Sequence, residues 1–215
     1  MDAAVRQADE DRWLASRFVG DAEKRADLIA LYAFDHELAR IAAVAREPLA
    51  QEIRLTWWRE ALDEISAPGA VRRHPVVEAL AVAVRRNGMP PEPLVGMIEA
   101  RFEAIDAPPT DEPARLRHID RTAGAVMRLA VQVLAPAEVD SPAIAPAARA
   151  WALARMGQPA TAALAQARAS ARRLPAAAFP AIAYATLARA YRRGRGPSPL
   201  GRRIRLLGAV LTGKL

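Results

Sequence analysis

The sequence contains no cysteine, which excludes a disulfide framework and a thiolate metal site. Aromatic residues are only 5% of the 215 residues, and strand-like runs that alternate apolar and polar residues are not found, so a sheet-rich domain is not expected. The longest mainly apolar run, residues 179–188, is too short to span a bilayer. The opening MDAAVRQADEDRW resembles neither a secretory signal nor a transit peptide. We expect a cytoplasmic protein.

Acidic residues are missing from the last third of the chain. Residues 141–215 hold 13 Lys and Arg but no Asp or Glu, whereas residues 1–140 hold 18 basic and 24 acidic residues. Such an asymmetry indicates an anionic partner, which could be a membrane surface, an acidic protein face or a nucleic acid. The alternative is a solvated basic face that keeps the protein soluble.

Alanine, leucine and arginine are abundant, and all three favour helix. Prolines and glycines divide the chain into segments of helical length. We expect helices over about 21–46, 49–66, 75–87, 91–105, 112–134, 147–157, 159–173, 176–193 and 200–212. The sequence therefore predicts one all-α domain over residues 1–215. Its parts are a core bundle (12–193), a linker (194–199) and a basic amphipathic tail helix (200–215).

Asp35 lies near the middle of an apolar helix face, at 100° per residue. That face contains Leu28, Leu31, Tyr32, Leu38, Ala39 and Ala42. An unpaired carboxylate in such a place is costly. We expect Asp35 to face the interior and to contact Arg46, Arg54 or Arg59, either as a structural ion pair or as part of a site.

A second acidic cluster follows at Glu60, Asp63 and Glu64, which are neighbours on a helix surface. It is either a cation site or a solvated acidic face, and Trp57 on the same side could form the wall of a pocket. The three histidines, His36, His74 and His118, have no metal-ligand spacing, and no phosphate-binding loop occurs. We therefore predict no metal and no cofactor. The candidate ligand-cavity residues are Asp35, Arg46, Arg54, Trp57, Arg59, Glu60 and Glu64.

Several segments follow one another in the order and spacing of the squalene/phytoene synthase family. They are DRWLASRF (11–18), LIALYAFDHELARI (28–41), EPLAQEIRLTWWREAL (47–62), HPVVEAL (74–80), IEARFEAID (98–106) and RTAGAVMRLAVQVL (121–134). The resemblance covers nearly the whole chain and implies an all-α isoprenoid synthase fold, here shortened toward the C-terminus. Active members of that family join two prenyl diphosphates head to head, and two Asp-rich motifs hold Mg²⁺ against the diphosphates.

The resemblance places the first Asp-rich motif on residues 39–43, where its carboxylate positions are Ala39, Arg40 and Ala43. No Asp or Glu follows Asp140 to supply the second motif. Residues 35–65 are most similar to the family branch that includes the mitochondrial complex I assembly factor and its α-proteobacterial relatives. These features imply a noncatalytic, membrane-associated assembly or maintenance factor for respiratory complex I that binds an isoprenoid or lipid. The alternative is a prenyl diphosphate transferase with a displaced, Mg²⁺-dependent site at Asp35, Glu60 and Glu64.

The tail helix combines basic and apolar residues. Leu200, Ile204, Leu207 and either Val210 or Leu211 lie roughly on one side. The candidate contacts to a membrane or protein partner are Arg192, Arg193, Arg195, Arg202, Arg203 and Arg205. A helix of this type either lies in a membrane interface, here at the inner face of the cytoplasmic membrane, or packs back on the bundle. We do not expect nucleic-acid binding, because few aromatic residues are interleaved with these arginines.

Overall fold

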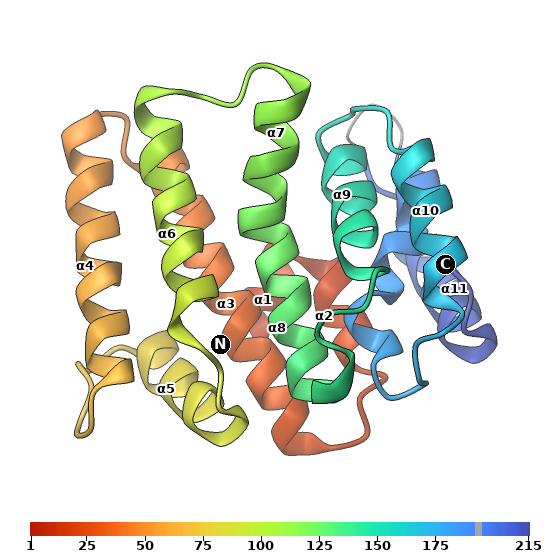
Figure 1. The fold of residues 1–215 in the computed structure, drawn as a ribbon, viewed down its shortest axis with the longest axis horizontal. Coiled ribbons are helices and arrows are strands. Elements are labelled where there is room, and N and C mark those ends of the chain that lie inside the picture. The colour runs from red at the N-terminus through yellow and green to blue at the C-terminus, as the bar shows by residue number, and fades with distance from the viewer. Residues whose placement is uncertain (192–194) are drawn as a thin grey trace.

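Helices form the regular structure of the computed structural model, which describes residues 1–191 and 195–215 (Figure 1). They are α1 (Asp2–Ala8), α2 (Glu10–Ser16), α3 (Ala22–Val44), α4 (Pro48–Ser66), α5 (Pro75–Asn87), α6 (Pro91–Asp106), α7 (Glu112–Ile119), α8 (Ala125–Leu134), α9 (Ile144–Arg155), α10 (Thr161–Ala171) and α11 (Pro199–Thr212). No strand occurs in the described residues. The all-α prediction is confirmed.

Local signals in the sequence explain where these helices begin and end. The Asp21 carboxylate accepts hydrogen bonds from the first free backbone N–H groups of α3. Helices α4, α5, α6 and α7 each have proline in the first turn, where its missing N–H costs nothing. Gly88 ends α5 in the left-handed conformation, with φ of 55°.

Most of the helices stand side by side, with α4 at one edge of the molecule and α10 and α11 at the opposite edge (Figure 1). Helix α5 lies across the lower end, beside α3 and α4. Helix α4 packs against α6, and α9 packs against α10. Helix α11 contacts the segment Ala183–Ala190 and α2. The molecule therefore joins its N-terminal helices to its C-terminal helix.

Helix α3 provides the centre of the core, because every residue from 27 to 34 is buried. Phe34 contacts Trp58 of α4 edge to face, with ring centroids 5.4 Å apart. Full burial of a large apolar side chain contributes about 1.5–3 kcal/mol. Asp35 follows this buried stretch of α3 directly, so its side chain lies close to the interior.

The helix predicted over 112–134 is interrupted by a π-helical turn at Asp120–Gly124. The Thr122 hydroxyl donates to the backbone oxygen of His118 at 2.7 Å. A Cβ at Gly124 would lie 3.3 Å from the backbone oxygen of Ile119, so glycine leaves room for the wider turn. The extra residue in the turn directs Asp120 toward Arg149 of α9. Arg149 Nη2 and Nε donate to the two carboxylate oxygens of Asp120 at 2.5 and 2.7 Å. Such turns break the 3.6-residue period without leaving a sequence signal of their own.

The predicted helix over 176–193 is wrong for the residues that the structure describes. They form two 3₁₀ segments, Phe179–Ala181 and Ala183–Ala190, while residues 192 and 193 lie outside the described part. Pro180 has no N–H, and its ring would clash with the carbonyl of residue 176, so an α-helix cannot run from 176 through Pro180; the ring does not constrain Ala183–Ala190 in this way. The structure also contains α1 and α2, which the sequence did not predict, and Val5 of α1 is buried against the bundle.

None of the described helices combines the length and the apolar character that crossing a membrane requires.

Two glycine substitutions are expected to have opposite effects on stability. Gly88→Ala places a Cβ in the left-handed conformation and should destabilise the fold by about 1 kcal/mol. The control is Gly96→Ala within α6, where nothing lies within 4 Å, and it should stabilise by about 0.5–1 kcal/mol. Urea unfolding of both variants measures the difference. Equal effects would contradict the assigned end of α5.

Candidate functional site

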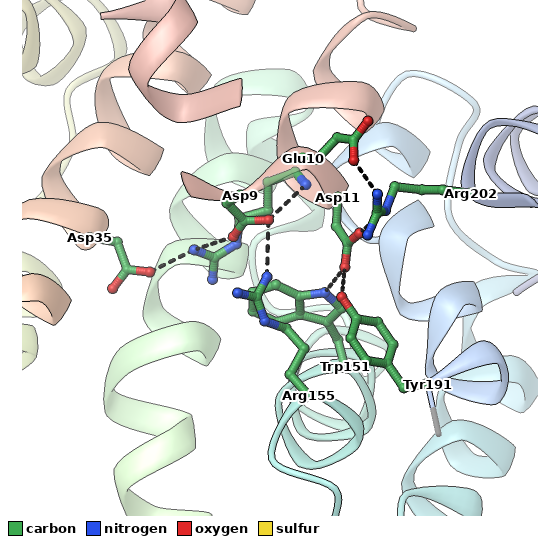
Figure 2. A network of polar contacts seen from close by, with 9 residues as sticks. Asp9, Glu10, Asp11, Asp35, Trp151, Arg155, Tyr191 and Arg202 are labelled. Carbon is green, nitrogen blue, oxygen red and sulfur yellow. Dashed lines mark hydrogen bonds and ion pairs between the residues drawn. The ribbon is translucent and has the colours of Figure 1, made fainter. Parts of the chain in front are cut away.

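A buried ion-pair network occupies the interior of the bundle (Figure 2). Arg12 of α2 donates to Asp35 of α3 at 2.6 Å, and Arg101 of α6 donates to the other Asp35 oxygen at 2.6 Å. Arg12 is only 2% exposed, and its guanidinium lies 4.4 Å from the ring centre of Trp151. Asp35 thus joins three helices at one carboxylate.

Asp35 faces the interior and is paired, as the sequence predicted, but the predicted partners are wrong. Arg59 pairs with Glu99 at 3.0 Å. Arg46 is exposed at the end of α3, and Arg54 lines a surface pocket. A helix wheel identifies the buried side of α3 but not which neighbouring helix faces it.

The charges around Asp35 control its protonation. Burial by itself raises the pKa of Asp35, but the charges and hydrogen bonds of Arg12 and Arg101 outweigh burial and lower the pKa from 3.8 to about 2. Asp35 is therefore ionised at neutral pH, and its single negative charge is shared between two guanidinium groups. A metal ion at this carboxylate would have to displace an arginine or lie beside its positive charge.

Asp11 forms the second part of the network (Figure 2). It is 1% exposed and accepts hydrogen bonds from Trp151 Nε1 at 2.9 Å, Tyr191 Oη at 2.5 Å and Arg202 Nε at 2.6 Å. Arg202 also pairs with Glu10. These contacts hold α11 on α2, and no signal in the sequence separates Asp11 from the other acidic residues near it.

The positions of the degenerate first motif lie at the surface of α3. Ala39, Arg40 and Ala43 are all exposed, and Arg40 pairs with Glu37 at 3.1 Å. Ala39 also lines a pocket of about 240 Å³ that reaches Arg101 and apolar side chains of three helices. Of the three motif positions, only Ala39 lines this small cavity, and none of the three offers a carboxylate to it.

The acidic cluster on α4 is occupied by an arginine. Arg72 donates to Glu64 at 2.7 and 3.1 Å and reaches Glu60 at 3.4 Å. The Arg72 guanidinium lies 4.7 Å from the ring centre of Trp57. Trp57 also lines a pocket of about 270 Å³ with Arg40, Arg54 and other residues, but neither Glu60 nor Glu64 lines that pocket. Arg72 was not predicted from the sequence, although it follows Glu64 by only eight residues.

The candidate contact arginines near the C-terminus have different surroundings. Arg195, Arg203 and Arg205 are exposed. Arg202 instead faces inward to α2, so it is not available at the surface. Arg192 and Arg193 lie outside the described residues.

The sequence comparison places the chain in a family. The squalene/phytoene synthase family model matches residues 5–155, which is most of the chain. The chain belongs to the squalene/phytoene synthase family. No curated protein matches it. The matched region contains Arg12, Asp35 and Arg101, so this part of the buried network lies within the squalene/phytoene synthase scaffold, whereas Tyr191 and Arg202 lie beyond the matched residues.

The Mg²⁺ implied by the family resemblance needs several oxygen ligands. Ala39, Arg40 and Ala43 provide none, and in the described part of the chain no group of three or more His, Asp or Glu is placed to hold a metal ion. The residues present therefore do not fit Mg²⁺ at the family's first motif.

Asp35→Asn should destabilise the protein by roughly 3–5 kcal/mol at pH 7, because it leaves the Arg12 charge buried without a full partner. The folded-state pKa of Asp35 is lowered, so its contribution is complete above pH 4 and declines as the pH falls toward about 2. The difference in the free energy of unfolding between wild type and variant should therefore become smaller at acidic pH. Urea unfolding at pH 7 and at lower pH measures it.

The matched control is Glu37→Gln, which removes a surface ion pair from the same helix. It should change stability by less than about 1 kcal/mol. If Asp35→Asn were as mild as this control at pH 7, the network would not support the fold.

Proposed function

We propose that this chain is a noncatalytic squalene/phytoene synthase family protein that serves as a membrane-associated assembly or maintenance factor for respiratory complex I. Its bundle binds an isoprenoid or another lipid. The observation that carries the proposal is the chemistry at the first motif, where Ala39, Arg40 and Ala43 stand in place of metal-binding carboxylates.

The reaction of the active family members explains why this substitution matters. Ionisation of an allylic diphosphate leaves negative charge on the departing group, and bound Mg²⁺ stabilises that charge by several kcal/mol. Alanine cannot hold the ion, and Arg40 is directed to Glu37 on the helix surface. Binding of a prenyl diphosphate remains compatible with this site, whereas its ionisation is not expected.

The rival function is a transferase with a displaced metal site at Asp35, Glu60 and Glu64. Each of these carboxylates is already held by arginine: Asp35 by two, and both glutamates by Arg72. Metal binding would have to break these ion pairs, including a buried one, and leave guanidinium groups beside the cation. The pairing therefore supports the noncatalytic role.

Two further observations support the lipid and respiratory parts of the proposal. The pocket of about 240 Å³ at the degenerate motif is lined by Leu38, Ile41, Leu55 and other apolar residues, which suit a hydrocarbon chain. The respiratory role rests on the resemblance of residues 35–65 to the branch that includes the complex I assembly factor.

Membrane association is assigned to α11. Its buried side consists of Leu206 and Ala209, whereas Leu200, Ile204 and Leu211 are 68%, 61% and 76% exposed. These exposed residues are spaced along one helix face, beside exposed arginines. An amphipathic basic helix of this kind suits an anionic membrane interface.

Vesicle binding tests this assignment. The double variant Arg203→Gln with Arg205→Gln should bind anionic vesicles roughly thirtyfold less tightly, because each arginine near an anionic leaflet contributes about 1 kcal/mol. Added salt should weaken wild-type binding, and neutral vesicles should bind little. The control is Arg73→Gln with Arg85→Gln, which removes the same charge near α5 and should bind as the wild type does. Equal loss in both double variants would contradict a role for α11.

An activity assay tests the noncatalytic role. Pure protein incubated with farnesyl or geranylgeranyl diphosphate, Mg²⁺ or Mn²⁺, and with or without NADPH should form no phytoene, squalene or presqualene product. Metal-dependent product that is abolished by Glu60→Ala or Glu64→Ala would establish the displaced-site transferase instead. These two substitutions are at the surface of α4, so loss of activity would not be confused with unfolding.

Gene deletion in the native host tests the respiratory role. We expect reduced assembly of the respiratory NADH dehydrogenase and unchanged carotenoid and hopanoid levels. Normal assembly with reduced isoprenoid products would contradict the proposal.

A further inference from the structure

A pocket lined mostly by residues beyond the family-matched region has an unusual balance of charge. It has a volume of about 720 Å³ and lies between the end of α9, one face of α10 and the segment that ends at Tyr191. We call it the α9–α10 pocket. Its cationic lining residues are Arg168 and Arg189, and its apolar lining includes Ala154, Leu164 and Ala188.

The charges of the two arginines of the α9–α10 pocket are not balanced by its lining, although Arg168 Nε donates to the backbone oxygen of Leu215 at 2.5 Å. No lining residue is acidic, and residues 141–215 contain no Asp or Glu. In the described part of the chain, the ion pairs include neither Arg168 nor Arg189. Partial burial, followed by the positive charge of Arg189, lowers the pKa of Arg168. Both effects disfavour the charge that Arg168 carries, and an anion between the two side chains would relieve them.

We propose that the α9–α10 pocket binds the phosphate group of an amphipathic phosphoester. Guanidinium groups bind phosphate oxygens through paired, charge-assisted hydrogen bonds, and two of them match a doubly charged phosphate. Ala154, Leu164 and Ala188 provide a surface for the apolar part of the same molecule. Thr161 adds a neutral hydrogen-bonding group about 10 Å from Arg168 along α10, and Gln158, which precedes α10, adds another.

The pocket is directly connected to the attachment of α11. Tyr191 lines the pocket, and its hydroxyl donates to Asp11, which also accepts from Arg202 of α11. A ligand in the pocket therefore lies one hydrogen bond from the contact that holds the tail helix. The phosphate could belong to a free compound or to the headgroup of a lipid in the membrane that α11 is proposed to touch. The proposal does not depend on whether the chain is catalytic.

Two binding measurements on the full chain, made in EDTA to exclude metal-mediated binding, separate these sources. The first is calorimetric titration with inorganic phosphate. The second is cosedimentation with vesicles that contain phosphatidate, compared with vesicles of phosphatidylcholine alone. Arg168→Gln and Arg189→Gln are the test variants. Arg173→Gln is the matched control, because Arg173 is exposed just beyond α10 and does not line the pocket.

We expect each test variant to weaken binding by about tenfold or more, since a hydrogen bond between charged groups is lost, while the control is unchanged. This loss in the phosphate titration identifies a free phosphoester. The same loss confined to phosphatidate vesicles identifies a lipid headgroup. Test variants that equal Arg173→Gln in both measurements, or a wild type that binds neither probe, would overturn the proposal.

The double variant Arg203→Gln with Arg205→Gln distinguishes a failure of the pocket proposal from a failure of the proposed membrane association. It should bind inorganic phosphate as the wild type does, even where its vesicle binding is reduced. Urea unfolding of Arg168→Gln and Arg189→Gln checks that both remain folded, which is expected because both side chains are at least partly exposed.

Discussion

In the described residues, every ion pair made by the last third of the chain uses an acidic side chain from the first two-thirds, because residues 141–215 contain no Asp or Glu. Three consecutive acidic residues at the start of α2, of which Asp9 caps the helix, provide most of these carboxylates. Asp9 pairs with Arg155 of α9, and Glu10 and Asp11 pair with Arg202 of α11. These contacts join segments up to 192 positions apart. The acidic start of α2 therefore holds α9 and α11 to the N-terminal part of the chain, although its composition is typical of a solvated terminus.

The same requirement for charge balance determines what the interior of the squalene/phytoene synthase scaffold can do. Arg12 is buried among aromatic rings, and its charge is tolerated because Asp35 and Asp9 lie beside it. Asp35 is shared with Arg101, so the carboxylate already neutralises as much positive charge as it can. A carboxylate committed to guanidinium groups does not serve as a hard-cation ligand. The network that stabilises the bundle therefore also limits its chemistry.

Much of the fold could be predicted from the sequence because its signals are local. Proline, glycine and the Asp21 cap set the ends of α3 to α6 to within about two residues. The inward direction of Asp35 followed from helical periodicity in the same way. Its partners could not be predicted, since Arg12 and Arg101 lie 23 and 66 positions away, and their approach depends on packing between helices. The prediction for residues 176–193 was wrong for a different reason, because alanine-rich sequence favours an α-helix, whereas Pro180 excludes one that runs through it from residue 176.

The arginines that remain after this pairing lie beside apolar surface. Arg203 and Arg205 adjoin the exposed leucine and isoleucine side chains of α11, and Arg168 and Arg189 adjoin the apolar lining of the α9–α10 pocket. A basic face that only increased solubility would not need exposed apolar residues next to it. A nucleic-acid surface would place aromatic rings between the arginines, and the tyrosines of this region, Tyr184 and Tyr191, are instead directed to the network of α2. Positive charge beside hydrocarbon suits a partner that is both anionic and apolar, and this argues for a lipid.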